Sequence, residues 1–145
     1  MKNKIPKLDY NCTLAKFAEQ LDIKLWQAMQ MMKYAEHKQD SIIKNLRSGV
    51  KILRGHNNSI IYNNINNNYE GILVSRSSNN LIYGNNIADN SGNGVIFIEG
   101  STNNSISNNT ISKNLVGIML KNSGFNHIKH NNLIDNIQEN LKIIK

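Results

Sequence analysis

The sequence is poor in the residues that define several protein classes. It holds one Pro and one Cys in 145 residues, and Cys12 alone cannot form an intramolecular disulfide, which excludes a disulfide-stapled scaffold. No apolar run approaches the roughly 20 residues of a membrane-spanning helix. Residues 1–11 contain no apolar stretch of the kind that a secretory signal needs. From the sequence as given, we therefore expect a cytoplasmic protein.

Acidic residues are also scarce, with 10 Asp and Glu against 17 Lys and Arg and a formal charge of +7. The basic residues are spread along the chain, so charge alone does not favour nucleic-acid binding. The chain is instead rich in Asn, with 27 residues, and in Ile, with 21. Asn-rich tracts can be disordered or can form a regular repeat, and their spacing distinguishes the two.

The Asn residues follow a repeat of 22 or 23 residues. The units span 49–70, 71–93, 94–116 and 117–139, and Asn140 takes the place of the unit-starting Gly in a fifth. Each unit contains the phrase Asn-x-Ile-x-x-Asn-x-Ile-x-x-Asn, with one Leu for Ile. The phrase defines three columns of equivalent residues, which are Asn58, Asn80, Asn104 and Asn126; Asn63, Asn85, Asn109 and Asn131; and Asn68, Asn90, Asn114 and Asn136.

A second phrase, at the start of each unit, alternates apolar and other residues with period two. This alternation is typical of a strand with one buried face. The intervening outward positions Leu73, Ile96 and Met119 form an apolar stripe. We predict this stripe to be a ligand-contact surface, with packing of an N-terminal helix across it as the alternative. Stacking of the units would bury the inward residues in one continuous core.

The Asn columns have a structural interpretation. Asn tolerates the left-handed backbone conformation that a sharp corner between strands requires. Stacked about 4.8 Å apart, identical Asn side chains can also hydrogen-bond from coil to coil. We therefore predict that the columns form corners and ladders rather than ligand sites.

The pattern resembles that of right-handed parallel β-helix proteins, over residues 49–145. Gly117-Ile118-Met119-Leu120-Lys121-Asn122-Ser123 followed by Asn126-His127-Ile128 is a clear instance. It is most similar to the NosD-like, carbohydrate-binding and sugar-hydrolase group of these solenoids. The resemblance implies a glycan ligand and relatives that are often exported. A leucine-rich repeat would have one Asn per unit, and a pentapeptide repeat would not be interrupted by the Gly phrase.

We predict an all-β solenoid of about four to five coils over residues 40–145, preceded by a helical segment over residues 1–39. Ile43 lies six residues before Gly49, as Ile65 lies six before Gly71, which suggests a partial first coil. Residues 13–38 show helical spacing. Such a segment would cap the open end of the solenoid.

Two alternatives concern these ends. The segment around Thr13 to Ile23 loosely resembles the first helix and turn of helix-turn-helix units, so a DNA-binding regulator stays open. The C-terminal coil has no evident cap beyond Lys142 and Lys145. We therefore expect either end-to-end self-association there, another partner, or a chain that is part of a longer solenoid.

Carboxylates suited to catalysis are few. Asp89 and Asp135 share a column two coils apart, but Lys113 lies between them on the intervening coil. A separation of about 10 Å would suit an inverting glycosidase, whereas the intervening Lys does not favour a raised acid pKa. A truncated or degenerate polysaccharide-processing enzyme is thus the alternative to a non-catalytic glycan-binding or structural module.

Metal binding is the last possibility, because the resemblance to NosD-like proteins implies a link with copper-site assembly. His127 and His130 are three residues apart, which would place them on opposite faces of a strand, and His56 lies in a turn. A contact between His130 and Met119 is the one copper pair that the pattern allows. We predict no metal site and no cofactor.

Overall fold

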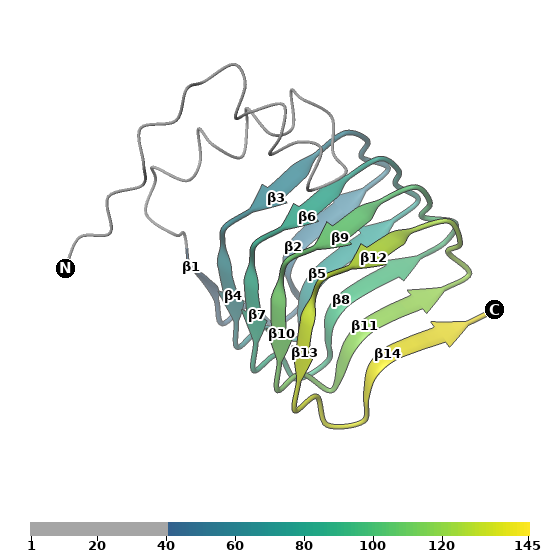
Figure 1. The fold of residues 1–145 in the computed structure, drawn as a ribbon. Coiled ribbons are helices and arrows are strands. Elements are labelled where there is room, and N and C mark those ends of the chain that lie inside the picture. Colours follow the sequence, from purple (N-terminus) through teal and green to yellow (C-terminus); the bar gives the residue numbers. More distant parts are fainter. Residues whose placement is uncertain (1–40) are drawn as a thin grey trace, which may run out of the picture. The chain divides into compact units, whose positions relative to one another are not determined.

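The computed structural model describes residues 41–145. The expected helical segment, its role as a cap and the alternative DNA-binding role all concern residues outside this part and stay predictions. Within it, 14 strands form three parallel sheets that wind as a β-solenoid of about four turns, as Figure 1 shows. The predicted solenoid is therefore confirmed for residues 41–145.

Each coil contributes one strand to each sheet, so sequence neighbours lie in different sheets. Sheet A contains β1 (Ser41–Ile43), β4 (Asn64–Asn66), β7 (Asn86–Ala88), β10 (Thr110–Ser112) and β13 (Asn132–Ile134). Sheet B contains the longer strands β2 (Ser48–Leu53), β5 (Glu70–Ser75), β8 (Asn93–Ile98), β11 (Val116–Lys121) and β14 (Glu139–Ile144). Sheet C contains β3 (Ser59–Ile61), β6 (Leu81–Tyr83), β9 (Ser105–Ser107) and β12 (His127–Lys129).

The core is the stack of inward aliphatic side chains. The middle residue of each short strand and two residues of each long strand point inward, and equivalent residues pair in register from coil to coil. Ile65, Ile87 and Ile111, for example, are all fully buried. No single coil could bury these residues, so the stacking of coils supplies the hydrophobic stabilisation.

The unit boundaries are confirmed, because each unit-starting Gly lies second in its sheet B strand. The predicted register of the first partial coil is wrong by one residue. Ile42, not Ile43, pairs with Ile65 and packs against the core, whereas Ile43 is 46% exposed. Four residues join β1 to β2 and only three join β4 to β5, so counting back from the Gly misplaces the strand.

The Asn columns form continuous ladders, as predicted. In the second column the backbone N–H and Nδ2 of Asn85 both donate to Oδ1 of Asn109, at 2.9 and 3.0 Å. Asn109 donates in the same way to Asn131. Nδ2 also donates to a core-strand carbonyl of the preceding coil, as from Asn85 to Ile60 at 2.8 Å. The bonds between ladder Asn residues therefore have one direction, from the N–H groups of each Asn to Oδ1 of the Asn on the next coil.

The ladder Asn residues are not the corner residues, which corrects part of the prediction. The left-handed conformation belongs to the residue immediately before each ladder Asn, such as Asn57 with φ 59°, Tyr62 with φ 57° and Asn67 with φ 55°. The ladder side chain must point into the coil to reach its neighbours. The preceding residue turns the chain and points its own side chain outward.

Candidate functional site

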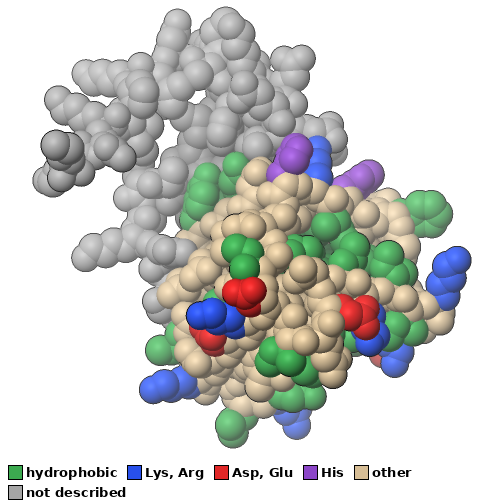
Figure 2. Space-filling model, turned by 60° about the horizontal axis from the view of Figure 1, so that its bottom comes forward, with side chains coloured by type: hydrophobic (Ala, Val, Ile, Leu, Met, Phe, Trp, Pro, Cys, Tyr) green, Lys and Arg blue, Asp and Glu red, His purple; other side chains and the backbone are tan. Residues whose placement is uncertain are grey.

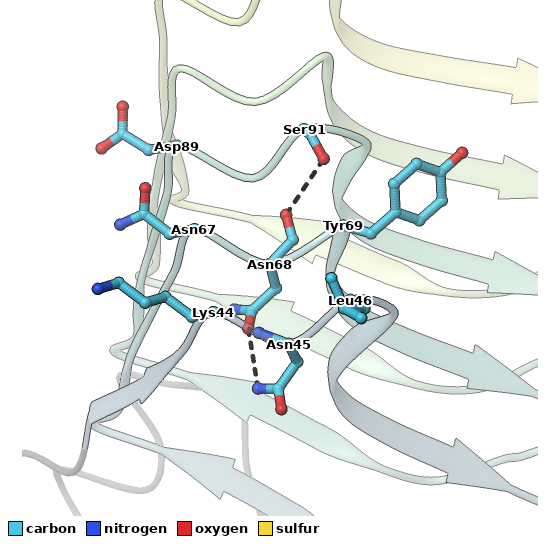
Figure 3. Close-up of a pocket in the computed structure, with 8 residues that line it drawn as sticks. All are labelled: Lys44, Asn45, Leu46, Asn67, Asn68, Tyr69, Asp89 and Ser91. Atoms are coloured by element: carbon cyan, nitrogen blue, oxygen red, sulfur yellow. Dashed lines mark hydrogen bonds between the residues drawn. The ribbon is translucent and has the colours of Figure 1, made fainter.

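A groove of about 540 Å³ opens where the first coils turn from sheet A into sheet B. Figure 3 shows its lining side chains, which come from three successive passes of the chain through this turn. They are Lys44, Asn45, Leu46, Asn67, Asn68, Tyr69, Asp89 and Ser91.

One wall of the groove is a column of corner residues. Lys44, Asn67 and Asp89 each follow directly after a sheet A strand and each has a positive φ, between 53° and 58°. All three are exposed, and Figure 3 shows them along the same side of the groove. The wall therefore offers a cation, an amide and a carboxylate on adjacent coils.

The floor of the groove is the start of the third Asn ladder. Asn68 is only 2% exposed, and its Oδ1 accepts hydrogen bonds from the backbone N–H and Nδ2 of Asn45, at 3.0 and 2.9 Å. Its carbonyl accepts from the backbone N–H of Ser91 at 2.9 Å. A floor fixed by so many bonds holds the exposed wall residues at defined positions.

The opposite wall is apolar. Tyr69 is 56% exposed and Leu46 is 97% exposed. The backbone N–H of Tyr69 bonds to the carbonyls of Asn45 and Arg47, at 3.2 and 3.0 Å, so the base of the side chain is anchored while the ring stays free. This side therefore adds an exposed aromatic ring, and Figure 3 shows that the ring points away from the side on which Lys44, Asn67 and Asp89 lie.

The groove was not predicted from the sequence. Asp89 was a candidate catalytic residue, but Tyr69, Asn67 and Lys44 were not among the predicted site residues. The sequence signal that could have indicated the groove is the change of residue type from coil to coil in one corner column, which contains Lys44, Asn67 and Asp89.

Glu70 lies next to the groove, at the start of β5. Its Oε2 accepts from the backbone N–H of Asn93 at 2.7 Å and its Oε1 accepts from Nδ2 of Asn93 at 3.2 Å. Burial nevertheless raises the pKa of the Glu70 carboxyl above its ordinary value, and the two hydrogen bonds oppose this in part. Asn93 Oδ1 is buried without a hydrogen-bond partner in the described structure.

The predicted column of Asp89, Lys113 and Asp135 is present. The three residues follow β7, β10 and β13, all have positive φ, and each backbone N–H of the first two bonds to the next coil. No ion pair joins Lys113 to either carboxylate within residues 41–145. The groove contains Asp89 but not Asp135, so the structure does not bring the two candidate catalytic residues into one site.

The predicted apolar stripe runs across the outer face of sheet B. Leu73 pairs with Ile96, and Ile96 with Met119. Ile96 is only 9% exposed, and the other two are half-buried. Lys51 and Lys142 extend the column at its two ends.

Three further aromatic side chains, Phe125, Tyr62 and Tyr83, differ in exposure. Phe125 is 84% exposed, whereas Tyr83 is buried and Tyr62 is half-buried. The two tyrosine rings meet edge to face with centroids 5.7 Å apart. Burial, together with the neighbouring phenol of Tyr83, raises the pKa of Tyr62 to about 12. This pair packs as part of the structure and presents less surface than Tyr69 does.

The described residues do not fit a copper site of three or more ligands. Copper is held by imidazole, thioether and thiolate groups. His56 lies in the turn after β2, with Nδ1 2.8 Å from Ser78 Oγ. Met119 lies on sheet B, whereas His130 lies at the corner between sheets C and A. No group of three His, Cys, Asp or Glu converges anywhere in residues 41–145.

The predicted placement of the two neighbouring histidines on opposite faces of one strand is wrong. β12 ends at Lys129, so His130 lies beyond the strand, at a corner with φ 53°, and both His127 and His130 are exposed.

In the part of the chain that the structure describes, no helix is long and apolar enough to cross a membrane.

Comparison with known proteins identifies a family but no individual relative. No curated protein matches the chain, and neither does any solved structure. Residues 27–144 match the protein family described as periplasmic copper-binding protein (NosD). The match covers most of the chain and the whole of the described solenoid up to Ile144. The chain therefore belongs to the NosD family of parallel β-solenoid proteins.

Proposed function

We propose that this protein is a non-catalytic β-solenoid module that binds a glycan in the groove between sheets A and B. The observation that supports this most directly is that one groove is lined both by an exposed aromatic ring, Tyr69, and by three exposed polar side chains of different chemistry. The glycan class itself comes from the resemblance to carbohydrate-binding solenoids.

The chemistry of the two walls suits a sugar. Sugar hydroxyls both donate and accept hydrogen bonds, and the wall offers the Lys44 ammonium as a donor, the Asp89 carboxylate as an acceptor and the Asn67 amide as both. The face of an aromatic ring carries partial negative charge, so it attracts the C–H groups on the flat side of a sugar ring. Tyr69 supplies that face.

Binding without turnover follows from the carboxylates. Glycoside hydrolysis uses a pair of carboxyl groups on either side of the scissile bond. Asp89 is the one carboxylate that lines the groove, and Asp135 lies two coils away beyond Lys113. The groove can therefore hold a sugar, but its lining lacks the second group that cleavage needs.

Copper binding is the function that the family's description names. For this chain we rank it below glycan binding, because the His and Met side chains of residues 41–145 lie on separate sides of the coil. The periplasm named in the same description is consistent with a ligand that is a cell-envelope glycan. DNA binding and end-to-end association stay predictions for the ends of the chain.

The test is a binding measurement with soluble glycans. The intact protein would be screened by calorimetry against cellohexaose, chitohexaose and polygalacturonate, with Tyr69→Ala as the diagnostic variant. We expect binding of at least one probe, and a loss of about tenfold or more in affinity for Tyr69→Ala. Phe125→Ala is the matched control, since it removes another exposed ring at a turn far from the groove along the coil. Equal binding by both variants, or no binding to any probe, would overturn the proposal.

A further inference from the structure

A cluster of basic side chains lies at the opposite ends of the same sheet B strands. Arg54 follows directly after β2, and Arg76 follows directly after β5. The backbone N–H of Arg54 donates to the carbonyl of Ser75, the residue before Arg76, at 3.0 Å. Adjacent coils therefore place the two arginines one above the other. Lys51 stands on the outer face of β2, three residues before Arg54.

A single carboxylate organises this cluster. Glu99 takes the same corner position on the third coil, and its Oε2 accepts from Ser75 Oγ at 2.6 Å and lies 3.1 Å from Arg76 Nε. The Ser75 hydroxyl, then Arg76, and also Arg54 and Lys51 hold the pKa of Glu99 below its ordinary value. The carboxylate thus stays charged and fixes Arg76, whose side chain is still half exposed.

The cluster nevertheless carries an excess of positive charge. Three cations face one carboxylate, and neither Lys51 nor Arg54 has an ion-pair partner among residues 41–145. Like charges on adjacent coils repel, and an external anion would relieve that repulsion. Guanidinium groups also bind carboxylate, sulfate and phosphate through paired hydrogen bonds. Figure 2, which shows one face of the molecule, has its few acidic side chains scattered beside basic ones rather than gathered.

We propose that Lys51, Arg54 and Arg76 form a second binding subsite, which takes the anionic groups of an acidic glycan. This rests on the proposed function for the class of ligand, and it adds that the glycan carries carboxylate or sulfate groups. The coils repeat about every 4.8 Å, which is close to the length of one sugar residue in an extended chain. Charged groups on successive sugars can therefore meet arginines on successive coils.

The experiment compares one polymer in two charge states. Affinity of the intact protein for polygalacturonate would be measured beside its fully methyl-esterified, uncharged form, at several salt concentrations. The variant Arg54→Gln/Arg76→Gln removes two charges from the cluster. Lys113→Gln/Lys145→Gln is the control, since it removes the same net charge from exposed positions elsewhere.

We expect the wild type to bind the charged polymer about tenfold more tightly than the ester. The arginine variant should lose this preference. The slope of the logarithm of affinity against the logarithm of salt concentration should become smaller in magnitude by about two, one for each cation removed. The lysine control should keep both. Thermal unfolding of each variant would show that the fold is intact.

Other outcomes separate the two proposals. If the ester binds as tightly as the acid and both need Tyr69, the anion subsite is wrong and the glycan groove stands. If the lysine control loses as much as the arginine variant, the preference reflects net charge and the subsite is also wrong. Tighter binding of a duplex DNA than of polygalacturonate would replace the glycan by a nucleic acid. If the protein does not bind the uncharged ester, and binds the acid only through the arginines, the anion subsite stands and the proposed glycan groove is wrong.

Discussion

Asn103 and Asn104 are neighbours of the same residue type in two different regions of the solenoid. Asn104 is fully buried in a ladder, where its Oδ1 accepts from the backbone N–H and Nδ2 of Asn80 at 3.0 and 2.9 Å. Asn103 is exposed at a corner, with φ 54°. One residue supplies contacts between coils, and the other supplies a backbone conformation.

This difference separates the framework from the surface that can change. The ladder columns keep Asn in every coil, because each side chain must both accept from one coil and donate to the next, as Asn104 accepts from Asn80 and donates to Asn126. The corner columns require only a tolerated positive φ, and they hold Lys, Arg, Tyr, Asp, Glu, Phe and His as well as Asn. Both proposed subsites use corner residues. The surface chemistry of the solenoid therefore resides in the columns that vary.

The largest effect should come from substitution within the ladder. Asn104→Ala removes the acceptor for two donors of Asn80, and it removes the donor to the Ser77 carbonyl and to Asn126 Oδ1. Because these groups would stay buried without partners, we expect a loss of about 3 kcal/mol in the free energy of unfolding. Chemical denaturation measures this. Asn103→Ala, one residue away, should cost only about 1 kcal/mol, from the left-handed conformation alone. Similar losses for both variants would contradict the distinction between ladder and corner.

A close second should come from the Gly that starts each unit. A Cβ at Gly71 would collide with the carbonyl oxygen of Gly94 and approach Cγ2 of Ile87 within 2.7 Å. Both obstacles belong to the stacked framework, so we expect Gly71→Ala to lower the free energy of unfolding by about 2 kcal/mol. Gly124→Ala is the control, since no atom lies within 4 Å of its added Cβ. If the Gly71 variant is as stable as the Gly124 variant, the stacked coils can move apart to admit the Cβ without a loss in the free energy of unfolding, and the predicted clash is wrong.

The sequence predicted the framework well because the framework repeats. Stacked coils impose one residue type at each buried position, so the spacing of Asn and Ile alone was enough to predict the ladders and the core. The register failed at Ile43, where the turn before β2 has one residue more than the turn before β5. The Ile-x-x-Asn phrase gives the correct register, because Ile42 lies three residues before Asn45 as Ile65 lies three before Asn68, whereas the distance to the Gly varies with the length of the turn.

The candidate site could not be predicted in the same way. Tyr69, Asn67 and Lys44 are brought together by the stacking of three turns, and none of them belongs to a column of constant residue type. Their common signal is the position directly beside a ladder Asn. This signal was missed because the ladder Asn residues were themselves predicted to form the corners, so the neighbouring positions were not considered as corner residues.

A smaller effect should come from Glu70, a variable position that is half-buried rather than exposed at a corner. Because burial raises the pKa of the folded carboxyl, the folded state binds a proton more tightly than the unfolded state does. Stability should therefore fall as the pH rises from about 4.3, the ordinary value, through the raised pKa. The contribution should stay below about 1 kcal/mol, since the side chain is partly exposed.

Glu70→Gln should remove this decline. The new amide can donate to Asn93 Oδ1, which lacks a partner, once the Asn93 amide turns over. Denaturation at pH 4 and pH 7 would compare the variant with wild type. Glu139→Gln changes the equivalent position of the last coil, where the carboxylate is exposed and pairs with Lys142 at 2.9 Å, and it should keep the decline. A wild type whose stability rises across this range, with no change in Glu70→Gln, would assign Glu70 no role in the pH dependence.

The smallest effect should be a gain, and it concerns the corner column that contains Asn103. Phe125 occupies the same position on the fourth coil, is 84% exposed and holds φ 52°, a conformation that bulky side chains disfavour and Asn tolerates. Phe125→Asn should therefore raise the free energy of unfolding by about 0.5 kcal/mol, measured by chemical denaturation. Phe125→Ala, which loses the ring without gaining a residue suited to the corner, should give no such increase. If instead the Asn variant is the less stable of the two, the ring of Phe125 must make a contact that its exposure does not suggest, and the corner columns would be part of the framework after all.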